Sequence, residues 1–133
     1  MKSEKATDKI EIGAFGEAAA EKHYLSTGFH TLDKNFKHRG GEIDLILKKN
    51  DLIVFAEVKA RSNFEEIHPS EAVIRGKRSK IINAAKYYIY KKEYAETDYY
   101  FRFDIVNIYI YSYPDKYKIE VFENAFDERG KII

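Results

Sequence analysis

The pattern of apolar residues predicts an α/β fold, a mixed β-sheet flanked by helices, with elements in the order α-β-β-β-α-β-β. Two segments carry apolar residues at helical spacing, and five other runs have strand-like composition and are separated by turn-forming residues. The chain has 133 residues, of which 44% are hydrophobic, which suffices for one core. We therefore predict a single domain over residues 13–133, preceded by a charged, flexible segment over residues 1–12.

The two helices are predicted over residues 13–28 and 76–92. The apolar stripe of the first stops at Gly28, and glycine is typical of the position after a helix C-terminus. This stripe consists of Phe15, Ala18, Ala19 and Leu25. The stripe of the second helix consists of Ile81, Ile82, Ala84, Ala85, Tyr88 and Ile89. Both helices should therefore bury one face.

The strands alternate with turns and one longer loop. Turns are predicted at residues 37–41 and 113–116, where glycine or proline interrupts the strand pattern, and residues 64–70 are predicted as a loop. The five predicted strands cover residues 29–36, 42–48, 52–60, 99–111 and 117–122.

Two acids and a lysine occur inside the second and third predicted strands, where buried apolar residues are expected. Successive strand side chains alternate between faces, so Glu57 and Lys59 project from the same side. If residues 50–51 form a two-residue hairpin loop, Asp44 lies directly opposite Glu57, and Glu42 lies opposite Lys59. Facing carboxylates repel each other unless a cation lies between them. The hairpin therefore predicts a site for Mg²⁺ or Mn²⁺ at Asp44 and Glu57.

Other interpretations of these charges stay open. Asp44 could cap a turn, and Glu42 with Lys59 could be an ordinary cross-strand ion pair on a solvated face. Glu17 could reach over the hairpin as a further metal ligand, or could merely offset the dipole in the first turn of its helix.

The densest basic run, Arg75 to Lys80, lies where the second helix should begin. Cations there oppose the helix dipole, which favours a shared anion such as phosphate. We expect Arg61, Lys77 and Lys80 to contact a nucleic-acid backbone. A solvated basic face is the alternative for each of them. The net charge of +1 provides no overall basic field, so binding would depend on this local patch.

The remaining polar and aromatic residues point to structural roles or exclude other chemistry. Asp104 is expected to pair with Arg102 or a lysine, and most of the 11 tyrosines and 9 phenylalanines are expected in the core rather than stacked on bases. The absence of cysteine excludes thiolate sites, and the histidines lack metal-ligand spacing. Without a signal peptide or a long apolar run, the chain is predicted to be cytoplasmic, with no membrane partner.

A series of motifs spans most of the chain from residue 13 to residue 106. The motifs are Gly13-x-x-Gly16-Glu17-x-x-Ala20, Gly28-Phe29, Asn35-Phe36, Gly41-Glu42-Ile43-Asp44-Leu45-Ile46, Val54-Phe55-Ala56-Glu57-Val58-Lys59-x-Arg61, Lys77 with Ala85, and Arg102-Phe103-Asp104-Ile105-Val106. In these residues and their order, the chain resembles the YraN-like family of uncharacterised bacterial proteins. One departure is Phe64-Glu65, where that family usually has Phe-Gly.

The resemblance implies a restriction-endonuclease-like fold with a PD-(D/E)xK site, similar to archaeal Holliday-junction resolvases. By this resemblance Asp44 and Glu57 would be metal ligands, Lys59 the catalytic lysine, and Glu17 the helix carboxylate of the metal site. The expected function is Mg²⁺-dependent hydrolysis of DNA phosphodiesters, with branched or recombination intermediates as candidate substrates and a homodimer left open. The alternatives are a non-catalytic nucleic-acid-binding protein with the nuclease fold, and an interaction protein whose acids only pair with lysines.

Overall fold

The computed structural model describes residues 2–62, 71–112 and 115–127. Within them the chain forms two helices and five strands in the predicted order, so the predicted mixed α/β fold is confirmed. The helices are α1 (Lys2–Ser26) and α2 (Glu71–Lys91). The strands are β1 (His30–His38), β2 (Gly41–Lys49), β3 (Leu52–Ser62), β4 (Tyr100–Ser112) and β5 (Lys116–Phe126). No helix among these residues is long and apolar enough to cross a membrane.

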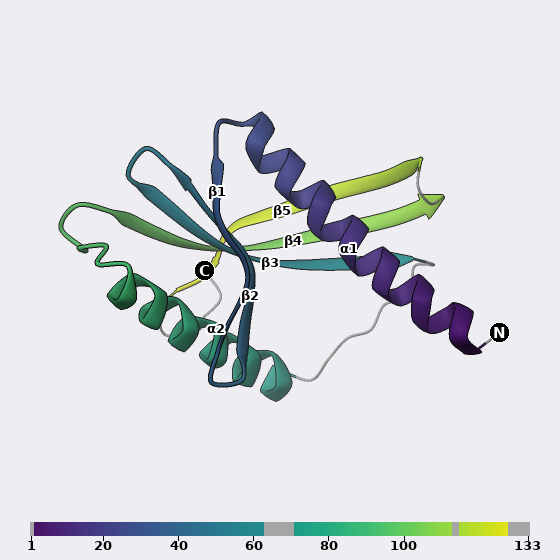
Figure 1. Cartoon of the computed structure of the whole chain (residues 1–133), viewed down its shortest axis with the longest axis horizontal. Helices are drawn as coiled ribbons and strands as arrows, with labels where there is room; N and C mark the ends of the chain where they lie inside the picture. Colours follow the sequence, from purple (N-terminus) through teal and green to yellow (C-terminus); the bar gives the residue numbers. More distant parts are fainter. Residues whose placement is uncertain (1, 63–70, 113–114, 128–133) are drawn as a thin grey trace.

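The sheet follows chain order, β1-β2-β3-β4-β5. All neighbouring strands are antiparallel except β3 and β4, which are parallel because α2 carries the chain back between them. Figure 1 shows α1 crossing one side of the sheet, and the β1–β2 hairpin crossing the other strands and reaching α2. The β1–β2 hairpin therefore contacts α2 as well as forming one edge of the sheet.

The sheet separates two apolar clusters, one for each helix. On one face, Ala20 and Tyr24 of α1 pack with Val54 of β3 and Val106 of β4. The other cluster combines the apolar stripe of α2 with residues such as Phe55 and Phe103. Alternation along β3 places even-numbered side chains against α1 and odd-numbered ones toward α2. The predicted stripe of α2 is buried in this way, whereas that of α1 is buried only in part, because Ala18 is exposed and Leu25 is 48% exposed.

The register predicted for the β2–β3 hairpin is confirmed along its paired length. Lys49 pairs with Leu52 across a two-residue turn, and the same register continues to Leu45 and Ala56. Asn50 in the turn has a φ of 54°, a left-handed conformation that asparagine tolerates better than most residues.

Several predicted boundaries are corrected. Helix α1 begins at Lys2 rather than Gly13, and α2 begins at Glu71 rather than Gly76, so the basic run lies inside α2 and not at its N-terminus. The basic run therefore lies past the first turn of α2, where the effect of the dipole at the helix N-terminus has fallen off. The flexible segment over residues 1–12 stays a prediction, and the loop expected at residues 64–70 lies outside the described residues.

Candidate functional site

The predicted acidic pair lies where β2 and β3 separate. Their ladder ends at Leu45 and Ala56, one pair short of Asp44 and Glu57, so the direct facing of these two acids is corrected. Instead, the backbone N–H of Val58 donates a hydrogen bond of 2.7 Å to Oδ2 of Asp44. The Asp44 carboxylate therefore occupies the gap between the strands. The predicted pairing of Glu42 with Lys59 lies beyond the ladder and is absent from it.

Glu57 and Lys59 lie on the face of β3 that points away from α1, as strand alternation predicts. The Glu57 side chain is only 8% exposed, and its Oε1 forms an ion pair with Nζ of Lys77 from α2. Lys77 was predicted to contact a nucleic-acid backbone, but its ammonium lies against the acidic site. Lys59 is half-buried and forms no ion pair with any residue that the structure describes.

Glu17 reaches the same region from α1. It lies in the middle of that helix, so the alternative in which it offsets the dipole of the first turn is wrong. The Asn35 amide donates to both Glu17 oxygens at 3.3 and 3.4 Å, and to Oε1 of Glu42 at 3.2 Å. One amide of β1 thereby holds two carboxylates from different elements. Asn35 has a φ of 50°, and no residue of β2 pairs with it in the β1–β2 ladder.

Two glycines permit the close approaches that assemble this site. A Cβ at Gly16 would lie 2.5 Å from the Cβ of Ala60, so α1 can pack directly on β3 only because residue 16 lacks a side chain. A Cβ at Gly41 would overlap the backbone carbonyl of Lys80, where β2 meets α2. The first contact places Glu17 beside the strands, and the second brings the start of β2 to α2 close to Lys77.

The local electrostatics concentrate negative charge around Asp44. Burial is the largest cause that raises the pKa of the Asp44 carboxyl, to about 6, although the Val58 N–H works in the opposite direction. Three neighbouring carboxylates raise this pKa further, those of Glu17, Glu57 and Glu42. A group of acids that resist joint ionisation would be stabilised by a cation.

The donor set fits a hard divalent cation, because it consists of carboxylate oxygens. The fit is supported by Asp44, which accepts one hydrogen bond on Oδ2, and by Glu57, whose buried Oε1 has only an ammonium against it. Among the described residues, however, no three acidic or histidine side chains converge closely enough to form a complete cage. The metal roles of Asp44, Glu57 and Glu17 therefore stay predictions.

The other predicted backbone-contacting residues lie on two sides of the site. Arg61 is half-buried on β3, on the same face as Lys59, and Lys80 is exposed on α2. Their contact with nucleic acid stays a prediction. The basic run does not form one exposed surface, because Arg78 within it is buried at 5% exposure.

Asp104 has the structural role expected from sequence. Its fully buried carboxylate accepts hydrogen bonds from the Arg102 guanidinium at 2.9 Å, the Tyr24 hydroxyl at 2.7 Å and the Asn124 backbone N–H at 2.9 Å. Asn35, by contrast, is a functional candidate that the sequence patterns contain but do not distinguish. The sequence signal that could have identified it is an asparagine inside a strand, since asparagine disfavours strands and tolerates positive φ.

Comparison with known proteins identifies the family. Residues 16–108 match the uncharacterised protein family UPF0102. A UPF0102 protein of Clostridium tetani (strain Massachusetts / E88) is 42% identical over 116 residues, covering 87% of this chain and 93% of its own. A UPF0102 protein of Clostridium botulinum (strain Kyoto / Type A2) is 39% identical over 116 residues, covering 87% and 94%. These matches confirm the YraN-like resemblance, and the chain belongs to the uncharacterised protein family UPF0102.

Proposed function

We propose that this protein is a metal-dependent endonuclease that hydrolyses phosphodiester bonds in DNA. The observation that carries the proposal is the Asp44 carboxyl, which lies between separating strands with a pKa raised to about 6 and three other carboxylates around it. A structural acid would be expected to have its charge neutralised by cations of the protein, whereas Asp44 accepts a single backbone N–H among the described residues. A bound cation would supply the missing charge.

Asp44 and Glu57 would hold the cation, with Glu17 as a further carboxylate from α1. A Mg²⁺ or Mn²⁺ ion at such a site supplies Lewis-acid activation of water and charge stabilisation at a phosphate. Lys59 would orient the attacking water or neutralise the developing negative charge, since it lies on the same face as Glu57 and forms no ion pair among the described residues. Asn35 would position Glu17 and Glu42 through its amide.

An adjacent polar face supports a phosphodiester substrate. The apolar contacts of α2 on β3 stop at Phe55, and beyond Glu57 this face of the sheet carries polar side chains. Arg61 lies beside Tyr109 of β4, which in turn lies beside Lys118 of β5. These side chains extend from the acidic site across three strands, where they would contact a backbone without reading sequence.

A cleavage assay tests the proposal. Purified protein is incubated with linear, single-stranded and four-way-junction DNA in Mg²⁺, Mn²⁺ or EDTA. We expect cleavage in metal only, abolished in Asp44→Asn and Lys59→Ala, and retained in Asp51→Asn, which changes an exposed turn acid. A folded protein that cleaves none of these DNAs with either metal would refute the endonuclease.

A second candidate is a nucleic-acid-binding protein that keeps the fold without turnover. The ion pair between Lys77 and Glu57 favours it, because an ammonium already neutralises the carboxylate that would have to bind the metal. In the same assay this candidate predicts DNA binding in EDTA without cleavage. Addition of Mn²⁺ would then leave the melting temperature unchanged, whereas a metal-binding site would raise it.

A further inference from the structure

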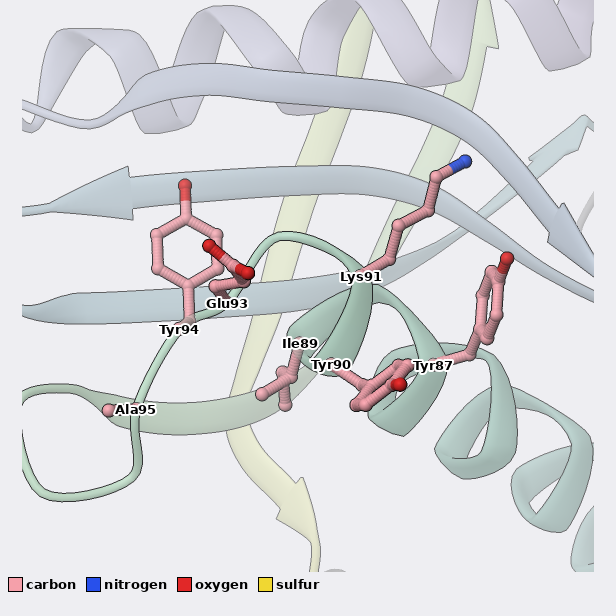
Figure 2. Close-up of a pocket in the computed structure, with 7 residues that line it drawn as sticks. All are labelled: Tyr87, Ile89, Tyr90, Lys91, Glu93, Tyr94 and Ala95. Carbon is pink, nitrogen blue, oxygen red and sulfur yellow. The ribbon is translucent and has the colours of Figure 1, made fainter.

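The outer side of α2 carries exposed aromatic and basic side chains in one stripe. Tyr87 is 36% exposed and Tyr90 is 81% exposed, which is unusual for such large rings. Positions 80, 87 and 91 share a row on the helix because residues three, four and seven apart lie on one face, and Tyr90 flanks this row. Figure 2 shows Tyr87 and Tyr90 projecting from the last turns of α2, whereas Tyr94 lies on the other side of the helix end.

The ring of Tyr87 is fixed by the β1–β2 hairpin. The His38 ring stacks on it with centroids 3.8 Å apart and planes 5° apart, and the centroid of the Phe36 ring lies 6.3 Å from that of Tyr87. The Lys91 ammonium is 6.0 Å from the Tyr87 ring centroid. A ring held in this way loses little conformational freedom when a flat ligand stacks beside it.

This stripe is continuous with the acidic site. A hollow at the β1–β2 turn is lined by residues from Lys37 to Glu42, and Glu42 shares the Asn35 amide with Glu17. A second hollow, drawn in Figure 2, is lined by Tyr87, on which the His38 ring of the first hollow stacks. The surface therefore leads from the carboxylates, past the turn, to the end of α2.

The charges along this path suit a polyanion. Lys37, Arg39 and Lys80 are exposed and form no ion pair with any residue in the described parts of the chain. Acids occur at the ends of the path, with Glu42 at the turn and Glu93 in the second hollow. Exposed aromatic rings between cations are the combination that binds unpaired strands, because bases in a duplex hide their faces.

We propose that this surface, defined by His38, Arg39, Lys80, Tyr87, Tyr90 and Lys91, binds an unpaired DNA strand and stacks its bases on the tyrosines. The inference rests on the proposed function, and it names the substrate as DNA with a single-stranded segment next to the cleaved bond. Lys80 and Arg39 contact the phosphates. Tyr90 supplies the exposed ring, and the His38–Tyr87 stack supplies the rigid one.

Fluorescence anisotropy in EDTA tests the surface without any cleavage. A labelled oligothymidylate is compared with a duplex of equal length, for the wild type, Tyr90→Ala, Tyr90→Phe and the matched control Tyr100→Ala, whose tyrosine is 71% exposed at the start of β4. We expect Tyr90→Ala to weaken single-strand binding roughly 5-fold or more, while Tyr90→Phe and Tyr100→Ala bind as the wild type does. Lys80→Ala should lower the slope of log affinity on log salt by about 0.7.

The outcomes separate this inference from the endonuclease. Single-strand binding that is weaker in Tyr90→Ala, but not in Tyr90→Phe or Tyr100→Ala, supports the surface even if no cleavage occurs with any metal. The surface is overturned and the endonuclease is kept if three results occur together. The protein cleaves DNA with metal, it binds the duplex more tightly than the single strand, and Tyr90→Ala leaves this binding unchanged. Tighter binding of oligouridylate than of oligothymidylate overturns the assignment to DNA. Thermal melts of the variants verify folding, and the high exposure of Tyr90 predicts unchanged melting temperatures.

Discussion

Two acids of the same sheet, the fully buried Asp104 and the half-buried Asp44, differ in how their charges are satisfied. The Asp104 carboxylate accepts hydrogen bonds from Arg102, Tyr24 and the Asn124 backbone, and Arg102 supplies the compensating charge. Asp44 accepts a single hydrogen bond from a backbone N–H, and carboxylates surround it. A buried acid that the protein neutralises is a structural element, whereas one left among like charges is suited to an external cation.

Removal of Asp104 should have the largest effect on stability. Asp104→Ala leaves the Arg102 guanidinium and the Tyr24 hydroxyl without their partner, so we expect a loss of about 3–5 kcal/mol in the free energy of unfolding. Urea denaturation measures it. Glu123→Ala is the control, because Glu123 lies 3.7 Å from Arg102 and is 68% exposed, and it should cost less than about 1 kcal/mol. Equal losses in the two variants would contradict the assignment.

Neutralisation of Asp44 should raise the free energy of unfolding, whereas removal of Asp104 lowers it. The folded-state pKa of Asp44, about 6, exceeds the value near 4 of an unfolded chain, so ionisation opposes folding. Its unfavourable contribution is absent below pH 4, develops between pH 4 and 6, and is complete above that. In EDTA, Asp44→Asn should therefore be roughly 1–3 kcal/mol more stable than the wild type at pH 8, and equal to it at pH 4.

Thermal unfolding at the two pH values measures this difference. Asp51→Asn, in the exposed turn of the same hairpin, should show no such gain. A destabilised Asp44→Asn at pH 8 would mean that Asp44 is a structural acid like Asp104.

The ion pair between Glu57 and Lys77 is intermediate between the two cases. Lys77→Met leaves the buried Glu57 carboxylate without its cation and should cost about 1–2 kcal/mol, less than a fully buried pair because Lys77 is 57% exposed. Combining it with Glu57→Gln should recover part of the loss, as a double-mutant cycle would report. Lys80→Met, one turn further along α2, should have no effect. An undiminished loss in the double variant would show that the two side chains are not coupled.

The smallest expected effect is at Asn35. Asn35→Gly removes the amide between Glu17 and Glu42 but accommodates the φ of 50°, whereas Asn35→Ala also strains the backbone. We expect Asn35→Ala to be roughly 0.5–1 kcal/mol less stable than Asn35→Gly in chemical denaturation. If the two variants were equally stable, the left-handed backbone at position 35 would not destabilise the alanine variant relative to the glycine variant.

The elements and the hairpin register could be predicted because they depend on local patterns. Alternation and helical spacing identified both helices and all five strands, and the Asn50 turn set the register up to Leu45 and Ala56. The same reasoning extended the pairing one step too far. Strands β2 and β3 separate at Asp44, close to where β2 meets α2 at Gly41, and a contact between elements so far apart in the chain leaves no periodic signal in the sequence.

The sequence by itself determined which side chains are candidates for the proposed site and which face of β3 they share, because strand periodicity requires Glu57 and Lys59 to project together. Only the tertiary structure decided their partners. It assigned Arg102 to Asp104 and Lys77 to Glu57, and it left Asp44 among carboxylates. The physical reason is that Coulomb interactions and desolvation depend on distance and burial, which local sequence does not specify across elements far apart in the chain.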